Sequence, residues 1–196
     1  MNVNVLYCDP AKGPYVELLG SERCWGIERD ARLYEGPEPG VFHPPCGGWG
    51  RMRPVHFKYN PNAKELTACG PRAVEQVRKY GGVLEHPDGS ALWKHCGLPR
   101  PGEGFDEYGG FTVAVRQVDW GHQTPKPTWL YIVPRSNGEA LRRMVLRVID
   151  ARRGTGVATH LICARKGARL PELPKRLRHV TPEPFARFLV DIASHC

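Results

Sequence analysis

The sequence predicts one α/β fold, built on a mainly parallel sheet with helices on both faces. Short apolar runs, each suited to a strand, alternate along the chain with segments of helical periodicity. Clusters of glycine and proline separate these segments, as expected for the loops between strands and helices. The 196 residues are enough for a single domain with a substantial core.

The apolar runs and the helical patterns define the individual elements. We expect strands over residues 3–7, 24–27, 41–42, 83–85, 111–115, 128–133 and 157–164. We expect helices over residues 15–19, 71–80, 139–150 and 182–192. Pro71 suits the first position of its helix, Gly81 ends that helix, and Thr181 is the expected cap of the last one.

The composition is that of an ordinary globular protein, with 41% hydrophobic residues. No apolar run approaches the roughly 18 to 20 residues that cross a bilayer, and the first residues lack the pattern of a signal peptide. We therefore expect a cytoplasmic protein with no membrane contact, whose seven widely spaced cysteines are reduced. The histidine and cysteine spacings match no zinc pattern, so we expect no metal site.

Positive charge is concentrated in one part of the chain. Residues 135–179 contain twelve Lys or Arg and three acidic residues, whereas the whole chain has a net charge of +8. This basic segment suits a polyanion, most simply nucleic acid, although a solvated basic face is the alternative. The arginines that we expect to contact phosphates are Arg142, Arg143, Arg152 and Arg153.

Four chemically useful side chains, Asp9, Glu28, Cys46 and Glu85, each directly follow a predicted strand. The carboxyl ends of parallel strands meet at one edge of a sheet, where binding sites of α/β proteins lie. We therefore expect these four residues to belong to a single site.

Cys46 and Glu85 are the strongest candidates for chemistry. Cys46 follows two prolines and precedes two glycines, which stiffen the loop and allow a ligand to approach, so we interpret it as a nucleophile. The alternative is a buried structural thiol. Glu85 leaves an apolar strand, and partial desolvation should raise its pKa and let it donate a proton. The alternative for Glu85 is an ion pair with an arginine.

A further candidate binding cluster follows the cysteine. Trp49 lies between two glycines and precedes Arg51 and Arg53. The indole could stack on a flipped or single-stranded base while the two arginines contact phosphates.

Several motifs, in the same order along the chain, resemble those of DNA cytosine-5 methyltransferases. Pro45-Cys46 resembles the nucleophile loop, Glu85-His86-Pro87 resembles the Glu-Asn-Val strand end, and residues 119–133 resemble the Gly-x-Pro-Gln-x-Arg-x-Arg segment. Weaker matches cover the first strand and its loop (5–13), the second strand (26–31) and a late Arg-x-Leu-Thr-x-x-Glu segment (178–189). The resemblance is closest to the small, divergent members carried by phages and prophages.

The resemblance implies a compact, truncated Rossmann-like fold of the S-adenosylmethionine-dependent methyltransferases. It also implies methyl transfer to cytosine in DNA through a covalent Cys46 adduct, with the target base flipped out of a duplex or taken from a single strand. Glu85 would hold and protonate the ring nitrogen. Lys126 and Thr128 stand where the family has two arginines, and would bind the base or its phosphate.

The same resemblance assigns the cofactor site and the division of the chain. Asp9, Gly13 and Glu28 would bind S-adenosylmethionine. Residues 1–134 would form the catalytic core, residues 135–178 a small basic insert in the target-recognition position, and residues 179–196 a helix that returns to the core. A phage-encoded member would act in the cytoplasm of its bacterial host.

Departures from the family pattern leave two other functions open. Pro10 and Pro14 occupy a loop that is glycine-rich in the family. The eighteen positions from Glu28 to Cys46 are too few for the additional strand and helix found there in the family. One alternative is a catalytically inactive methyltransferase-fold phage protein that binds nucleic acid or a protein partner. The other is cysteine-dependent pyrimidine modification with another donor or with a free nucleotide as substrate.

Overall fold

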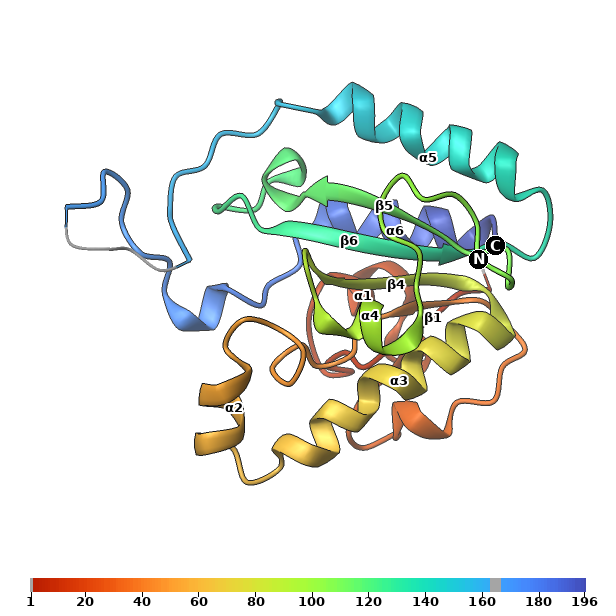
Figure 1. Ribbon diagram of the computed structural model, residues 1–196, viewed down its shortest axis with the longest axis horizontal. Coiled ribbons are helices and arrows are strands. Elements are labelled where there is room, and N and C mark those ends of the chain that lie inside the picture. Colours follow the sequence, from red (N-terminus) through yellow and green to blue (C-terminus); the bar gives the residue numbers. More distant parts are fainter. Residues whose placement is uncertain (1, 163–166) are drawn as a thin grey trace.

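The protein is an α/β structure with a six-stranded, mostly parallel sheet, as the sequence predicts (Figure 1). The computed structural model describes residues 2–162 and 167–196. The strands are β1 Asn4–Leu6, β2 Cys24–Trp25, β3 Gly40–Phe42, β4 Gly82–Pro87, β5 Phe111–Arg116 and β6 Pro127–Val133. The α-helices are α1 Pro14–Leu19, α2 Arg53–Tyr59, α3 Ala63–Tyr80, α4 Ala91–Cys96, α5 Gly138–Arg152 and α6 Glu183–Ser194. Short 3₁₀ turns are η1 Ser21–Arg23, η2 Ala31–Leu33, η3 Gln117–Trp120 and η4 Lys175–Leu177.

The strand order is β2-β1-β3-β4-β6-β5, and β1 to β4 are mutually parallel. Strand β6 is inserted antiparallel between β4 and β5, with Glu85 opposite Leu130 and Val115 opposite Thr128. The carboxyl ends of β1, β3, β4 and β5 therefore meet the beginning of β6, and we call this the site edge. Because β1 has β2 on one side and β3 on the other, the sheet has a topological switch point between β1 and β3.

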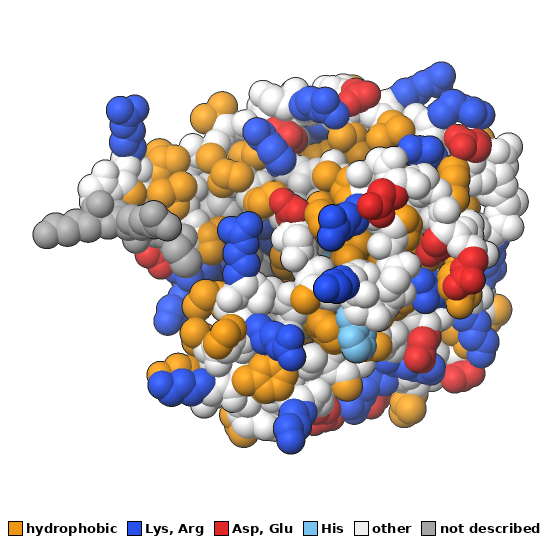
Figure 2. Space-filling view, viewed as in Figure 1, with side chains coloured by type: hydrophobic (Ala, Val, Ile, Leu, Met, Phe, Trp, Pro, Cys, Tyr) orange, Lys and Arg blue, Asp and Glu red, His pale blue; other side chains and the backbone are white. Residues whose placement is uncertain are grey.

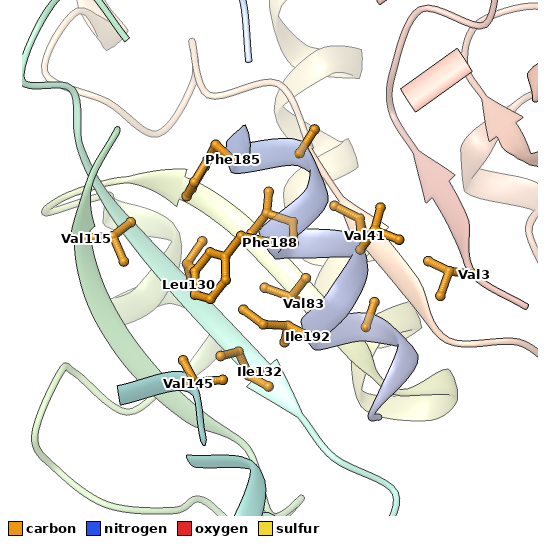
Figure 3. Close-up of a cluster of buried hydrophobic side chains, with 14 of the residues drawn as sticks. Val3, Val41, Val83, Val115, Leu130, Ile132, Val145, Phe185, Phe188 and Ile192 are labelled. Carbon is orange, nitrogen blue, oxygen red and sulfur yellow. The ribbon is translucent and has the colours of Figure 1, made fainter. Parts of the chain in front are cut away.

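The central strands are buried on both faces, as expected for parallel strands covered by helices on each side. On one face, α1, α5 and α6 cover an apolar cluster in which Phe185, Phe188 and Ile192 of α6 lie over Val41, Val83 and Leu130 of the sheet (Figure 3). On the other face, α3 and α4 cover a second cluster, which includes Leu6, Phe42 and Leu84. Helices on both faces of the sheet are therefore confirmed.

The predicted start of the helix over residues 71–80 is wrong, because α3 begins at Ala63 and contains Pro71 in its interior. A proline there removes the N–H that would bind the carbonyl oxygen of Thr67 and disfavours helix at the preceding residue. The Trp49 indole Nε1 donates a hydrogen bond to that Thr67 oxygen at 2.9 Å. A side chain from the preceding loop thus replaces the missing backbone bond.

The strand predicted over residues 157–164 is also wrong where the structure describes it, from 157 to 162, and residues 163–164 lie outside the described part. This segment runs along the turn after β5 instead of joining the sheet. The N–H groups of Thr159 and His160 both donate to the carbonyl oxygen of Gln123 at 3.0 Å. Gly156 permits this course, since a Cβ there would lie 1.9 Å from the Val118 oxygen.

Three smaller differences concern helix ends and short helices. Helix α4 lies in a stretch, residues 87–110, that the sequence assigns to a glycine- and proline-rich loop, and helix α2 lies where no element is expected. The cap of α6 is Pro182, with no side-chain capping bond, so the capping role predicted for Thr181 is wrong.

Among the described residues, no helix is both long and apolar enough to cross a membrane.

Candidate active site

Two adjoining cavities open at the switch point between β1 and β3. The site cavity, of about 620 Å³, is lined by Cys46, Glu85 and Lys126. The outer cavity, of about 800 Å³, lies over the ends of β1 and β2. Tyr7, Cys8, Asp9 and Pro45 line both cavities, so a ligand could extend from one into the other. This is the place where the topology of an α/β sheet predicts ligand binding.

Cys46 lies on a tight turn four residues beyond the end of β3, and its carbonyl oxygen accepts hydrogen bonds from the N–H groups of Trp49 and Gly50, both at 3.0 Å. The thiol is half-buried and faces the site cavity rather than an apolar core. The adjacent glycines serve the protein's own packing, because a Cβ on Gly48 would lie 1.9 Å from the Thr67 hydroxyl on α3. Burial raises the pKa of the thiol, the charge of Glu85 adds to this, and Lys126 opposes it.

Glu85 is held by two hydrogen bonds inside the site cavity. Its Oε2 lies 3.1 Å from Nδ1 of His43, and its Oε1 accepts a bond of 3.0 Å from Nε2 of Gln117. Burial by itself would raise the pKa of Glu85, as expected from the sequence. The hydrogen bond and charge of His43, with a contribution from Lys126, instead lower this pKa to about 2. The pKa of Glu85 is therefore lowered, not raised as the sequence led us to expect.

His43 links Glu85 to α1. Its Nε2 lies 2.6 Å from the hydroxyl of Tyr15, which is 5% exposed and belongs to the core beside the cavity. The His43 and Glu85 side chains are only 14% and 15% exposed, so the pair is shielded from solvent. The result is a continuous hydrogen-bonded chain from Tyr15 through His43 and Glu85 to Gln117.

Lys126 and Thr128 have different environments. Lys126 lines the site cavity at the start of β6, and burial lowers its pKa while the charges of Glu85 and Cys46 oppose the change. Thr128 is 1% exposed and does not line this cavity. Its hydroxyl accepts a bond from Gln117 at 3.1 Å and donates to the Lys126 carbonyl oxygen at 3.0 Å. Direct contact of Thr128 with a base or phosphate does not fit this position, and its role is to hold Gln117.

The three residues expected to bind the cofactor are distributed over both cavities. Asp9 lines both, Glu28 lines the outer cavity, and Gly13 lines the site cavity. Asp9 and Glu28 are both exposed, but the Asp9 carboxylate already accepts the N–H of Ala11 at 2.9 Å and lies 3.6 Å from the Lys12 ammonium. Of these two carboxylates, Glu28 is therefore the more available to a ligand.

Strained backbone marks the rim of the site. Tyr7 and Lys126 have φ values of +64° and +38°, in the left-handed region that non-glycine residues rarely adopt. Both side chains line the site cavity. Strain of this kind persists where the surrounding structure enforces it, commonly at functional sites.

The residues expected to bind nucleic acid after the cysteine divide into two groups. Trp49 is 8% exposed, packs in the core cluster and donates its N–H to Thr67. It is therefore a packing residue, and stacking on a base does not fit its position. Arg51 and Arg53 are exposed at the start of α2 beside the cysteine loop, where they are free to contact a phosphate backbone.

The four arginines of α5 and its end do not form one patch. Arg142 lies 5.5 Å from the ring of Phe105, which bridges to the start of β5 at the edge opposite the site. Arg143 is its exposed neighbour, about 15 Å along the helix from Arg152 and Arg153. Arg153 lies near the site edge, where it lines a small cavity with Arg116. Figure 2 shows that, on the face of the molecule in view, Lys and Arg side chains are dispersed and interspersed with Asp and Glu.

Sequence reasoning missed five residues around the site: Tyr15, His43, Gln117, Arg176 and His179. His43 carried the clearest signal, because it directly follows a predicted strand in the same loop as Cys46. Arg176 and His179 line the site cavity from the C-terminal part of the basic segment. Gln117 has no sequence signal, since it follows β5 without any motif.

Comparisons with protein-family models, with curated proteins and with solved structures returned no match.

Proposed function

We propose that this chain is a DNA cytosine-5 methyltransferase-like enzyme, in which Cys46 adds to the cytosine ring and S-adenosylmethionine donates the methyl group. The observation that carries the proposal is the convergence of Cys46, Glu85 and Lys126 on one cavity at the switch point of the sheet. These residues come from three separated parts of the sequence, and the motif resemblance assigns all three to the same reaction. The finer assignment of the fold, to a truncated Rossmann-like methyltransferase, is part of this proposal.

The chemistry needs a nucleophile, a group on the ring nitrogen and a cation near the forming thiolate. Addition of the Cys46 sulfur to C6 of cytosine makes C5 enamine-like and able to attack an electrophilic carbon. Glu85 would contact the ring nitrogen of the cytosine and the exocyclic amino group beside it. The charge of Lys126 opposes the rise in the thiol pKa that burial and Glu85 cause, and so favours the attacking thiolate.

S-adenosylmethionine would supply an activated methyl group, and the outer cavity has the features that an adenosyl group needs. Its volume of about 800 Å³ lies within the usual range for small-molecule sites. Ile27 and Leu66 give it an apolar wall, and Ile27 is 97% exposed. The exposed carboxylate of Glu28 could accept hydrogen bonds from ribose hydroxyls. The wall continues into the site cavity through Tyr7 and Pro45, so adenosyl and methyl ends would occupy adjoining spaces.

A nucleic-acid substrate is supported by the cations around the site. Arg51 and Arg53 extend from the loop that carries Cys46, and Arg176 lines the cavity. Cations at these positions would hold phosphates beside a base inserted into the site cavity. The target base would have to leave a duplex or come from a single strand.

The test is methyl transfer from labelled S-adenosylmethionine to unmethylated DNA, with the product base identified after hydrolysis. The proposal predicts label in 5-methylcytosine with the wild type and with Cys96→Ala, a matched control outside the cavity, and none with Cys46→Ala. Calorimetry with S-adenosylhomocysteine should give binding that Glu28→Ala weakens. No binding at millimolar cofactor together with no transfer would refute the proposal and favour the inactive, binding-only alternative.

A further inference from the structure

The carboxylate that contacts the ring is not an isolated acid in this protein. Glu85 has a hydrogen-bonded partner on each oxygen, His43 at 3.1 Å and Gln117 at 3.0 Å. The side chains of His43 and Glu85 are shielded from solvent, and Gln117 is 1% exposed. An ionised carboxylate is the form that accepts both of these bonds.

An ionised Glu85 creates a chemical requirement at the ring. The ring nitrogen of cytosine accepts hydrogen bonds, and so does an ionised carboxylate. The two atoms would therefore repel one another unless a proton lies between them. Addition of a thiolate to the ring is favoured when that nitrogen becomes protonated, because negative charge otherwise develops there. The proton must therefore come from a group next to Glu85.

His43 is the one titratable side chain that is hydrogen-bonded to Glu85 in the part of the chain that the structure describes. Its second nitrogen lies 2.6 Å from the Tyr15 hydroxyl. That hydroxyl can donate to neutral His43 or accept from protonated His43, so it holds the ring in place in both states. Tyr15 is anchored in the core, which fixes the geometry of the chain.

We propose that His43 delivers a proton through Glu85 to the ring nitrogen of the bound pyrimidine, with Tyr15 and Gln117 holding the chain in line. This proposal rests on the proposed function, since it adds a proton path to the same reaction. The Nδ1–H bond of protonated His43 breaks as an O–H bond forms on Glu85, and that O–H bond breaks as the ring N–H forms. The Cys46 thiol loses its own proton to solvent. When the adduct breaks down and the thiolate leaves, the ring N–H bond breaks and its proton returns through Glu85 to Nδ1 of His43.

Other charged and titratable groups face the pair from neighbouring elements. They are Tyr15 on α1, Cys46 after β3, His86 on β4, Lys126 before β6, and Arg176 and His179 from the C-terminal segment. Asp9 and Lys12 also line the cavity, paired with each other at 3.6 Å. Among the described residues, none of these groups is hydrogen-bonded to Glu85. Tyr15 is hydrogen-bonded to His43, and His43 is the titratable side chain bonded to Glu85. The proton delivered to the ring is therefore assigned to His43.

The decisive variant is His43→Asn. Asparagine places an N–H donor near the former Nδ1 and keeps the bond to Glu85, but it carries no exchangeable charge. His195→Asn, at the exposed end of α6, is the matched control for the same substitution away from the cavity. His43→Ala removes both the bond and the proton.

The first measurement is the rate of covalent adduct formation with DNA that contains 5-fluorocytosine, in the presence of S-adenosylmethionine, from pH 5.5 to 8.5. The His195→Asn rate should match the wild-type rate across this range. His43→Asn should be at least tenfold slower at pH 7, because its side chain has no proton to deliver. A wild-type adduct with an unchanged rate and profile in His43→Asn overturns the proton path and leaves the proposed function standing. No adduct in the wild type overturns the proposed function, and the proton path to the ring with it.

The second measurement needs no substrate. Carbon-13 NMR of glutamate carboxyls, with Glu85 identified by its absence in Glu85→Gln, follows ionisation between pH 4 and 8. Glu85 should stay ionised throughout this range in the wild type and in His43→Asn, and should titrate within it in His43→Ala. An unchanged Glu85 signal in His43→Ala would contradict the pairing on which the proton path depends.

Discussion

The hydrogen bond from Trp49 to Thr67 ties the loop of the candidate nucleophile to α3, and it predicts an energetic coupling between Trp49 and Pro71. Pro71 leaves the Thr67 carbonyl oxygen without its helical N–H, and the indole supplies the donor at 2.9 Å. Trp49→Phe keeps an aromatic ring in the core but removes that donor. Pro71→Ala restores a backbone N–H four residues after Thr67.

The magnitude follows from what each change leaves unpaired. In Trp49→Phe a carbonyl in the protein interior loses its partner, which costs about 1–3 kcal/mol. The smaller ring adds about 1 kcal/mol for lost packing, since Trp49 is only 8% exposed. In the Pro71→Ala background the helix can bond the carbonyl itself, so the same Trp49→Phe change should cost about 1–2 kcal/mol less.

Urea unfolding of the wild type, the two single variants and the double variant measures this coupling directly. Equal slopes against urea concentration would show that the four proteins unfold with the same exposed surface. If the two changes add to within about 0.5 kcal/mol, the indole does not replace the helical donor and this reasoning fails.

Three further predictions concern the walls and the charges of the site. Burial lowers the pKa of His86 to about 4, below its unfolded value of about 6.5, so stability is full above pH 6.5 and falls as the pH is lowered towards 4. This group contributes about 3 kcal/mol of that fall, and His86→Asn should show a correspondingly flatter unfolding free energy between pH 7 and 4. Gly48→Ala should destabilise by about 1–3 kcal/mol in thermal or urea unfolding, because its Cβ would overlap Thr67, whereas Gly89→Ala, where a Cβ meets nothing within 4 Å, reports the cost of backbone strain alone. Reversing the charges of Arg152 and Arg153 should reduce the slope of log K for DNA binding against log salt concentration by the amount expected for about two lost phosphate contacts. The same change at Arg142 and Arg143, at the far edge, should leave that slope nearly unchanged.

The sequence predicts the order of most strands and helices because hydrophobic periodicity determines them locally. It fails where a distant residue decides the outcome. Pro71 indicates a helix start in the sequence. Helix α3 continues past Pro71 because the indole of Trp49, from another loop, supplies the missing donor. Residues 157–162 have the composition of a strand, but their backbone bonds are made with Gln123 and with residues 171–173 instead of with the sheet.

The candidate site shows the same division. The rule that strand ends converge predicts that Cys46 and Glu85 share a cavity, and both line it. The ionisation of Glu85 was predicted in the wrong direction, because its partner His43 lies 42 positions away on the neighbouring strand end. Burial of one residue can be inferred from a local pattern, whereas the partner that offsets it depends on the register of the whole sheet.

The central claim, that Cys46 is the nucleophile of a pyrimidine-modifying site, is tested most directly by mapping a trapped adduct. DNA containing 5-fluorocytosine, incubated with the protein and S-adenosylmethionine, should give a species stable to denaturation. Mass spectrometry of its proteolytic peptides should place the modified base on the peptide that contains Cys46 and on no other cysteine. A base attached elsewhere, or an adduct that persists in Cys46→Ala, would contradict the account.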